Sequence, residues 1–152
     1  MAAVLDDNSL RLVRVFDAPR ERVWDAIVDP DQLVKWFGHD GITTTAEIDA
    51  RPGGEFRAAM VNDADGSEVA SFAGRYRDID EPSRLVQVFE NPEDPSDPNT
   101  EILTYTLRDV DGGTELTYHQ VGHLPDEQYP LIVQGVNGFY DRLEKHLAGV
   151  DG

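Results

Sequence analysis

The sequence predicts an α+β domain in which one curved antiparallel sheet, of about six to seven strands, packs around a long C-terminal helix. Three observations predict it. Strand-like alternation fills most of Gly41 to Gly122, a long amphipathic segment follows at Pro125 to Leu147, and two short helical segments follow the first strand. Strand runs bounded by helices favour an antiparallel sheet over repeated βαβ units. A single helix covers only part of so long a sheet, so we expect the sheet to curve and leave a cavity.

The first strand and the two short helices are predicted by local sequence signals. Leu10 to Phe16 is rich in Leu, Val and Phe, as strands are. Asp17-Ala18-Pro19 then opens a helix over Arg20 to Val28, with Asp17 expected to cap its exposed backbone donors. Asp29-Pro30 repeats this arrangement and begins a second helix that ends near Trp36.

The central part of the chain is a series of alternating segments separated by turn residues. Glycine, proline, asparagine and aspartate occupy the breaks, as is typical of hairpin connections. Asn91 to Asn99 carries three prolines among acidic residues and is predicted to be an exposed loop. The expected strands are 42–49, 55–61, 67–79, 84–90, 100–108 and 114–122.

The C-terminal segment has its apolar residues on a single helical stripe, at steps of three and four. The stripe comprises Tyr129, Ile132, Val133, Val136, Phe139, Tyr140, Leu143 and Leu147. We expect Leu143 and Leu147 to sit in dry core, and Ile132, Val136 and Tyr140 to line the cavity. The whole chain is then a single domain, with its core over about 10–148 and tails at 1–9 and 149–152.

The charge balance limits the possible partners. The chain has 13 basic and 30 acidic residues, for a net charge of -17, which disfavours binding to nucleic acid or to anionic membranes. An acidic, lysine-poor surface suits high salt, but it also follows from a coding bias; only the first interpretation predicts strong stabilisation by KCl. No apolar run approaches the ~20 residues of a membrane span, and no signal peptide is recognisable. We therefore expect a cytoplasmic protein.

The sequence favours neither a metal centre nor a nucleophilic active site. It has no cysteine, and its four histidines lack ligand spacing: His119 and His123 straddle a strand end, where they would lie ~13 Å apart if extended. None of its serines lies in a nucleophile-elbow sequence. We expect no catalytic residue, no metal and no cofactor.

Seven short motifs follow one another along the chain. They are the opening at Val15 to Ala26, Asp29-Pro30 with Trp36-Phe37-Gly38, Arg51-Pro52-Gly53-Gly54, Gly74-Arg75-Tyr76, Pro82 to Val86, Gly112-Gly113-Thr114 and Gly135-Val136-Asn137-Gly138. In this order they resemble the motifs of the START-like (SRPBCC) proteins. Within that superfamily, the branch of homologues of the heat-shock protein 90 ATPase activator is the most similar, and the resemblance covers Leu10 to Leu147.

The resemblance implies the helix-grip fold, in which a curved antiparallel sheet holds the C-terminal helix around an apolar cavity. It implies less about activity, because the superfamily includes lipid carriers, plant hormone receptors and polyketide cyclases. Val136 stands where the branch usually has tryptophan, and Phe37 stands where a second tryptophan is frequent. These two departures suggest an altered pocket.

The aromatic and polar residues of the inner faces are the candidate binding residues. Several buried phenols would need hydrogen-bond partners, which a ligand or trapped water can supply. We therefore expect a small hydrophobic or amphipathic molecule to bind in a cavity of ~300–1,000 Å³. The candidate lining residues are Trp36, Phe56, Phe72, Tyr76, Phe89, Tyr105, Tyr118, Gln120, Ile132, Val136 and Tyr140.

Two other interpretations remain open. The same cavity could serve an enzyme of cyclase or hydrolase type, which a buried, cavity-facing carboxylate or histidine with a strongly shifted pKa would favour. A co-chaperone-like interaction module would instead be favoured by an apolar patch on the outer face of the sheet. The sequence leaves monomer and homodimer equally open.

Overall fold

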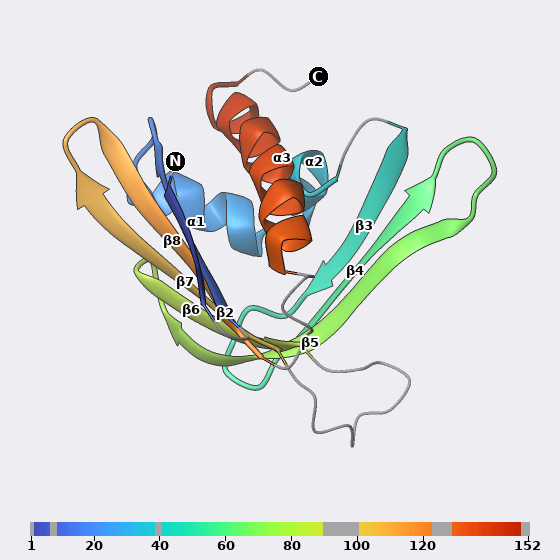
Figure 1. Ribbon diagram of the computed structural model, residues 1–152, viewed down its shortest axis with the longest axis horizontal. Coiled ribbons are helices and arrows are strands. Elements are labelled where there is room, and N and C mark those ends of the chain that lie inside the picture. Colours follow the sequence, from blue (N-terminus) through green and yellow to red (C-terminus); the bar gives the residue numbers. More distant parts are fainter. Residues whose placement is uncertain (1, 7–8, 39–40, 90–100, 123–128, 150–152) are drawn as a thin grey trace.

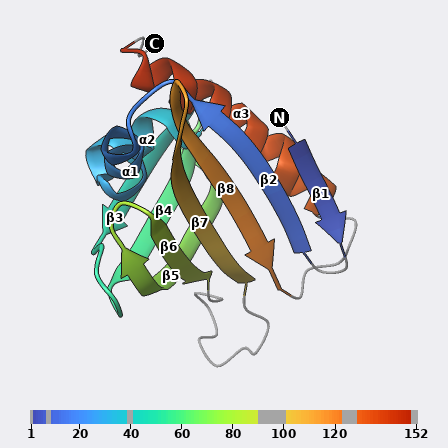
Figure 2. The same cartoon turned by 90° about the vertical axis from the view of Figure 1, so that its left-hand side faces the viewer.

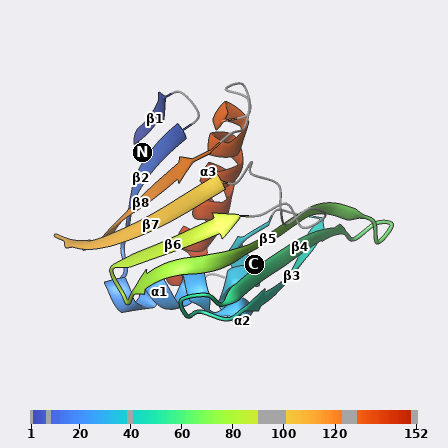
Figure 3. The ribbon, with the colours of Figure 1, turned by 90° about the horizontal axis from the view of Figure 1, so that it is seen from below.

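A single curved antiparallel sheet holds the longest helix against its concave side (Figure 1). The computed structural model describes residues 2–6, 9–38, 41–89, 101–122 and 129–149, with the side chains of 2–6 excepted. The sheet has eight strands in the order β1-β2-β8-β7-β6-β5-β4-β3, which Figure 3 displays from below. The strands are β1 Ala2–Asp6, β2 Ser9–Phe16, β3 Ile42–Ile48, β4 Glu55–Asn62, β5 Glu68–Asp80, β6 Arg84–Phe89, β7 Glu101–Val110 and β8 Gly113–Val121.

The seven strands predicted from the sequence are confirmed, with ends that differ by one or two residues. The eighth, β1, lies in the segment expected to be an N-terminal tail. It forms the edge of the sheet by pairing antiparallel to β2, with Ala2 opposite Val13 and Asp6 opposite Ser9. The loop predicted at Asn91 to Asn99 lies outside the described residues.

The curvature has local causes in β4 and β5. The pairing register shifts between Met60 and Val61 and again between Tyr76 and Asp78, and such irregularities bend and twist a strand. Beside the second shift, Gly74 lies against β6 so closely that a Cβ there would be 2.2 Å from the Val88 carbonyl oxygen. The sheet therefore folds over toward its concave side at β5.

The two short helices, α1 Arg20–Val28 and α2 Pro30–Trp36, begin and end where the sequence predicts. The Asp29 carboxylate accepts a hydrogen bond from the Asp31 amide at 3.0 Å and so caps α2 as expected. The expected cap at Asp17 is wrong. Pro19 is the N-cap of α1 and makes no side-chain hydrogen bond, because the prolines of the two helices occupy different positions: N-cap in α1, first helical residue in α2.

The C-terminal helix α3 spans Tyr129–Leu147 and packs against β1, β2, α1 and α2 (Figure 2). The prediction placed its start at Pro125, and residues 125–128 lie outside the described ranges. Leu143 is completely buried and Leu147 half-buried, so the far end of the helix rests in the core. His146 is also buried, with its Nε2 3.1 Å from the Gln32 Oε1.

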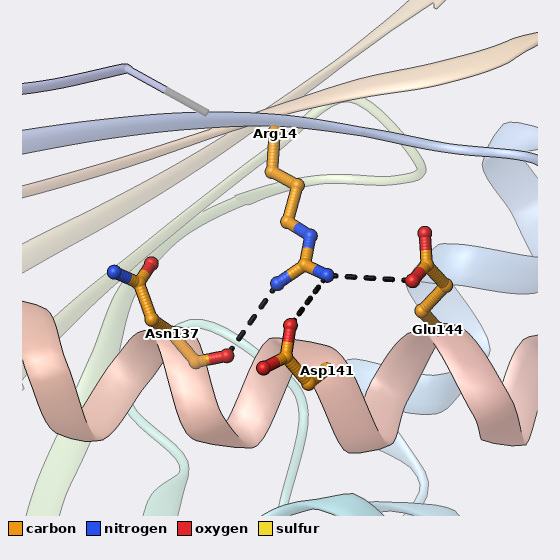
Figure 4. Close-up of polar contacts among 4 residues, drawn as sticks. All are labelled: Arg14, Asn137, Asp141 and Glu144. Atoms are coloured by element: carbon orange, nitrogen blue, oxygen red, sulfur yellow. Dashed lines mark hydrogen bonds and ion pairs between the residues drawn. The ribbon is translucent and has the colours of Figure 1, made fainter.

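One polar side chain on the inner face of β2 fixes α3 to the sheet. Leu10, Leu12, Arg14 and Phe16 share this face, and the Arg14 side chain is only 13% exposed. Its guanidinium donates to Asp141 Oδ1 at 2.8 Å and to the Asn137 carbonyl at 3.4 Å, and lies 3.5 Å from Glu144 (Figure 4). The middle of α3 is therefore held over β2.

Candidate ligand-binding cavity

A cavity of about 360 Å³ lies between α3, the end of α2 and the concave face of β4 to β8. This volume is near the lower end of the ~300–1,000 Å³ range of small-molecule sites. It corresponds to the volume that roughly a dozen water molecules occupy in liquid water. Its lining is mostly aliphatic and aromatic. The lining residues are Ile27, Leu33, Trp36, Phe37, Phe56, Ser71, Phe72, Ala73, Gln87, Phe89, Glu101, Leu103, Tyr105, Tyr118, Gln120, Ile132, Gly135, Val136, Phe139 and Tyr140.

All the candidate residues except Tyr76 lie around this cavity. Tyr76 is buried elsewhere in the core, with its ring packed edge-on to Phe56 at a centroid distance of 6.3 Å. The part of β5 that lines the cavity ends at Ala73, before the strand reaches Tyr76. That the remaining residues hold a ligand stays a prediction.

The cavity has a buried floor and a partly exposed rim. Trp36 closes one side of the floor, where its indole Nε1 donates to the Ala26 carbonyl at 2.8 Å and fixes the ring. At the rim, the half-buried Phe37 lies 4.8 Å from the Phe139 ring and 5.3 Å from the Phe72 ring, centroid to centroid. Three phenylalanines from α3, β5 and the end of α2 thus converge at the opening.

A chain of hydrogen bonds crosses the polar end of the cavity. Tyr118 Oη donates to Gln120 Oε1 at 2.6 Å, and Gln120 Nε2 donates to Glu101 Oε1 at 2.8 Å. Tyr129 Oη donates to the same carboxylate oxygen at 3.0 Å. A Cβ on Gly122 would collide with Glu101 Oε2, so the glycine leaves room for this carboxylate. The site therefore combines a long apolar wall with one hydrogen-bonded acidic end.

The phenols of the floor are neutral at ordinary pH. Burial raises the pKa of Tyr105, Tyr118 and Tyr140 well above the usual value, because the charged phenolate would lose its hydration. The Tyr140 hydroxyl is buried without a hydrogen-bond partner, although it lies near enough to the Tyr105 hydroxyl for each to influence the other's pKa. Tyr140 thus offers the cavity an unused hydrogen-bonding group.

Three polar lining residues, Ser71, Gln87 and Glu101, are absent from the set predicted from the sequence. The strand period of two could have indicated two of them. Gln87 lies on the same face of β6 as Leu85 and Phe89, and Glu101 lies on the same face of β7 as Leu103 and Tyr105. Arg75, also on β5, does not line the cavity: its side chain is half exposed and pairs with Glu55.

A second hollow, of about 640 Å³, lies over β3, β4 and β5. The charged residues Glu55, Arg57 and Arg75 contribute to its lining, are exposed and pair with one another. Such pairs are solvated and contribute little energy. This hollow therefore lacks the buried, convergent polar groups that distinguish the cavity under α3.

The curved antiparallel sheet and the C-terminal helix on its concave side define a START-like protein of the helix-grip type. The chain belongs to the family described as "Activator of Hsp90 ATPase homolog 1-like protein", whose sequence pattern matches residues 17–148. No curated protein matches the chain.

Several solved structures share the fold across almost their whole length. A protein from Chromobacterium violaceum is 30% identical, with 93% of this chain and 98% of that chain covered and a TM-score of 0.77. A protein from Mycobacterium smegmatis is 24% identical (97% and 96% covered, TM-score 0.80). One from Rhodobacter sphaeroides is 22% identical (97% and 98% covered, TM-score 0.83). These last two similarities concern the fold alone.

Within the described ranges, no helix combines the length and the apolarity that crossing a bilayer requires. In the same part of the chain, no three His, Cys, Asp or Glu side chains gather closely enough to hold a metal ion.

Proposed function

We propose that this protein binds a small hydrophobic or amphipathic molecule in the cavity between α3 and the sheet. The observation that carries the proposal is the cavity itself: about 360 Å³, lined mostly by apolar and aromatic side chains from α2, α3 and several strands. A pocket of this size with a few convergent polar groups is typical of small-molecule sites. The Tyr140 hydroxyl, buried without a partner, supports it, because buried polar groups are rarely left unsatisfied.

The position of Val136 allows a direct test. Val136 is buried, lies on α3 and forms part of the cavity wall, so a tryptophan there would extend into the empty volume. Leu131 lies on the same helix but is 64% exposed and does not line the cavity. Val136→Trp and Leu131→Trp therefore add the same ring inside and outside the proposed site.

The experiment titrates each variant with N-phenyl-naphthylamine, an uncharged dye whose fluorescence rises in apolar surroundings, and examines the untreated protein by native mass spectrometry. We expect saturable binding to the unmodified protein and to Leu131→Trp, and binding at least about tenfold weaker to Val136→Trp. Absence of dye binding and of any co-purified molecule would refute the proposal. Equal binding to all three proteins would place the dye outside this cavity.

No observation gives comparable support to the interaction module. Four large apolar side chains are exposed among the described residues, and they belong to four different elements: Val15, Val69, Val121 and Leu131. Isolated apolar side chains of this kind are normal on protein surfaces.

A further inference from the structure

Three tyrosines line the floor of the cavity, and their hydroxyl groups differ in the hydrogen bonds they make. Tyr105, Tyr118 and Tyr140 are at most 7% exposed, and all three contribute to the lining. Tyr118 Oη donates its single proton to Gln120 Oε1 at 2.6 Å. The Tyr140 hydroxyl, in contrast, is buried without a hydrogen-bond partner in the described part of the chain.

The hydroxyls of Tyr105 and Tyr140 form a pair that keeps at least one proton for a ligand. Burial raises the pKa of both phenols, and each lies near enough to the other to influence its pKa, so both remain protonated at ordinary pH. Beyond Tyr140 itself, no described residue is hydrogen-bonded to the Tyr105 hydroxyl. A bond between the two hydroxyls would use only one of their two protons.

Neighbouring rings fix the position of the Tyr140 hydroxyl. The Phe16 and Tyr118 rings pack edge-on to the Tyr140 ring at centroid distances of 5.7 and 6.5 Å, and the Trp36 ring lies at 6.2 Å. Tyr118 also packs edge-on to Tyr105, at 5.7 Å. Because Tyr140 lies on α3 and Tyr105 on β7, the two hydroxyls come from the helix and from the sheet. A ligand would therefore meet hydroxyls that are already in place, which lowers the cost of binding.

Hydroxyl protons that lack an acceptor select a ligand that brings lone pairs. A carbonyl oxygen has two lone pairs and no proton, so it can accept a hydrogen bond from one or both hydroxyls. An alcohol would add a further proton that itself needs an acceptor, and a hydrocarbon would leave the buried hydroxyls unsatisfied. The rest of the lining is mostly aliphatic and aromatic, so the remainder of the ligand should be apolar.

We propose that the ligand of this cavity is an apolar molecule with a carbonyl group, as in a ketone, an aldehyde or an ester, whose oxygen accepts hydrogen bonds from the Tyr105 and Tyr140 hydroxyls. This inference rests on the proposed function and names the chemical class of ligand for the same site. It gives the two tyrosines the role of specificity-determining residues.

Acetophenone and α-methylstyrene test this preference, because they have nearly the same shape and differ only in the carbonyl oxygen, which a methylene group replaces. Each competes with N-phenyl-naphthylamine, which has no carbonyl group. The concentration for half-displacement is measured for the unmodified protein and for each variant, and is corrected for the affinity of that protein for the dye. Comparing variant with unmodified protein for each probe cancels the difference in hydration between the two probes.

Two variants assign the preference to the hydroxyl pair. The double variant Tyr105→Phe/Tyr140→Phe removes both hydroxyls and keeps both rings. We expect acetophenone to need at least about fivefold more competitor for half-displacement, the effect of one net hydrogen bond, and α-methylstyrene no more than about twofold more. Tyr76→Phe is the matched control, because the Tyr76 hydroxyl is also buried without a partner among the described residues but does not line the cavity. It should change both values by less than about twofold.

A second measurement needs only the unmodified protein. Infrared spectroscopy of isotope-labelled acetophenone gives the stretching frequency of its carbonyl group in the cavity, and hydrogen bonds to the carbonyl oxygen lower that frequency. We expect the bound probe to absorb at a lower frequency than acetophenone in hexane. A frequency equal to that in hexane would overturn the inference, even if the double variant failed to fold.

The outcomes separate the two proposals. If the dye binds the unmodified protein but acetophenone does not displace it, or the double variant weakens both probes equally or neither, the inference about ligand class is wrong and the proposed function stands. The same conclusion follows if Tyr76→Phe reproduces the loss that is specific for acetophenone. If neither dye binding nor a co-purified molecule is detected, both proposals fail.

Discussion

The buried hydroxyls of α3 provide a pair of matched substitutions with opposite expected effects. Tyr129 and Tyr140 are each 1% exposed, but Tyr129 donates to Glu101 at 3.0 Å whereas Tyr140 has no partner for its hydroxyl. Replacing each with phenylalanine removes a single oxygen atom. The two variants therefore compare a satisfied with an unsatisfied hydroxyl in one helix.

The magnitudes follow from the cost of burying polar groups. Loss of the Tyr129 hydrogen bond to a half-buried carboxylate should lower the free energy of unfolding by about 1–2 kcal/mol. Removing the Tyr140 hydroxyl should raise it by up to about 1 kcal/mol, because an unpaired buried hydroxyl costs about 1–3 kcal/mol and water in the cavity offsets part of that. A difference of about 2 kcal/mol corresponds to about 4–8 °C in Tm for a domain of this size.

Urea unfolding followed by circular dichroism, together with calorimetric Tm values, measures both effects on the ligand-free protein. We expect Tyr140→Phe to be at least as stable as the unmodified protein and Tyr129→Phe to be clearly less stable. If Tyr140→Phe loses as much stability as Tyr129→Phe, the Tyr140 hydroxyl has a partner in the folded protein, and its availability to a ligand is refuted.

Three further predictions concern the contacts between Arg14 and α3, the cavity wall at Val136 and the buried tyrosine hydroxyls. Arg14→Met should lower the free energy of unfolding by about 1–2 kcal/mol in low-salt urea titrations, and by less in KCl at about 1 M; no loss would mean that the ion pairs do not hold α3. Val136→Trp should change stability by less than about 1 kcal/mol, whereas a loss of about 3 kcal/mol would mean a solidly packed site. Burial raises the pKa of Tyr105 and Tyr118 above the value of about 10 in the unfolded chain, so the folded state retains protons that the unfolded state releases. Their contribution to stability should be complete below about pH 10 and lost as pH rises toward their folded pKa values; tyrosinate absorbance showing ordinary titration in the folded protein would contradict this.

The elements with strong local signals could be predicted from the sequence, and those fixed by pairing could not. The helix at Arg20–Val28 and the alternation of Leu103, Tyr105 and Leu107 follow from residue spacing alone. Strand β1 does not, because a short edge strand is specified by the register that its partner β2 offers.

The residues of the candidate site also fall into those that local sequence patterns predict and those that only the tertiary structure brings together. Inward positions on regular strands, such as Phe56 and Tyr118, could be predicted from the period of two. The exclusion of Tyr76 could not, because the period of two gives the face on which a residue lies but not how far along β5 the cavity extends. The importance of Glu101 arises from Gln120 and Tyr129 meeting it from a neighbouring strand and from α3, which no local pattern records.

The two tryptophans allow the most direct measurement of the central claim. Trp36 lines the cavity, whereas Trp24 is equally buried, lies on α1 and does not line it. In an isotope-labelled sample titrated with octanol, the indole N–H signal of Trp36 should shift saturably with a stoichiometry of one ligand per chain, while that of Trp24 stays in place. Stationary signals from both, or equal shifts of both, would contradict a ligand site beneath α3.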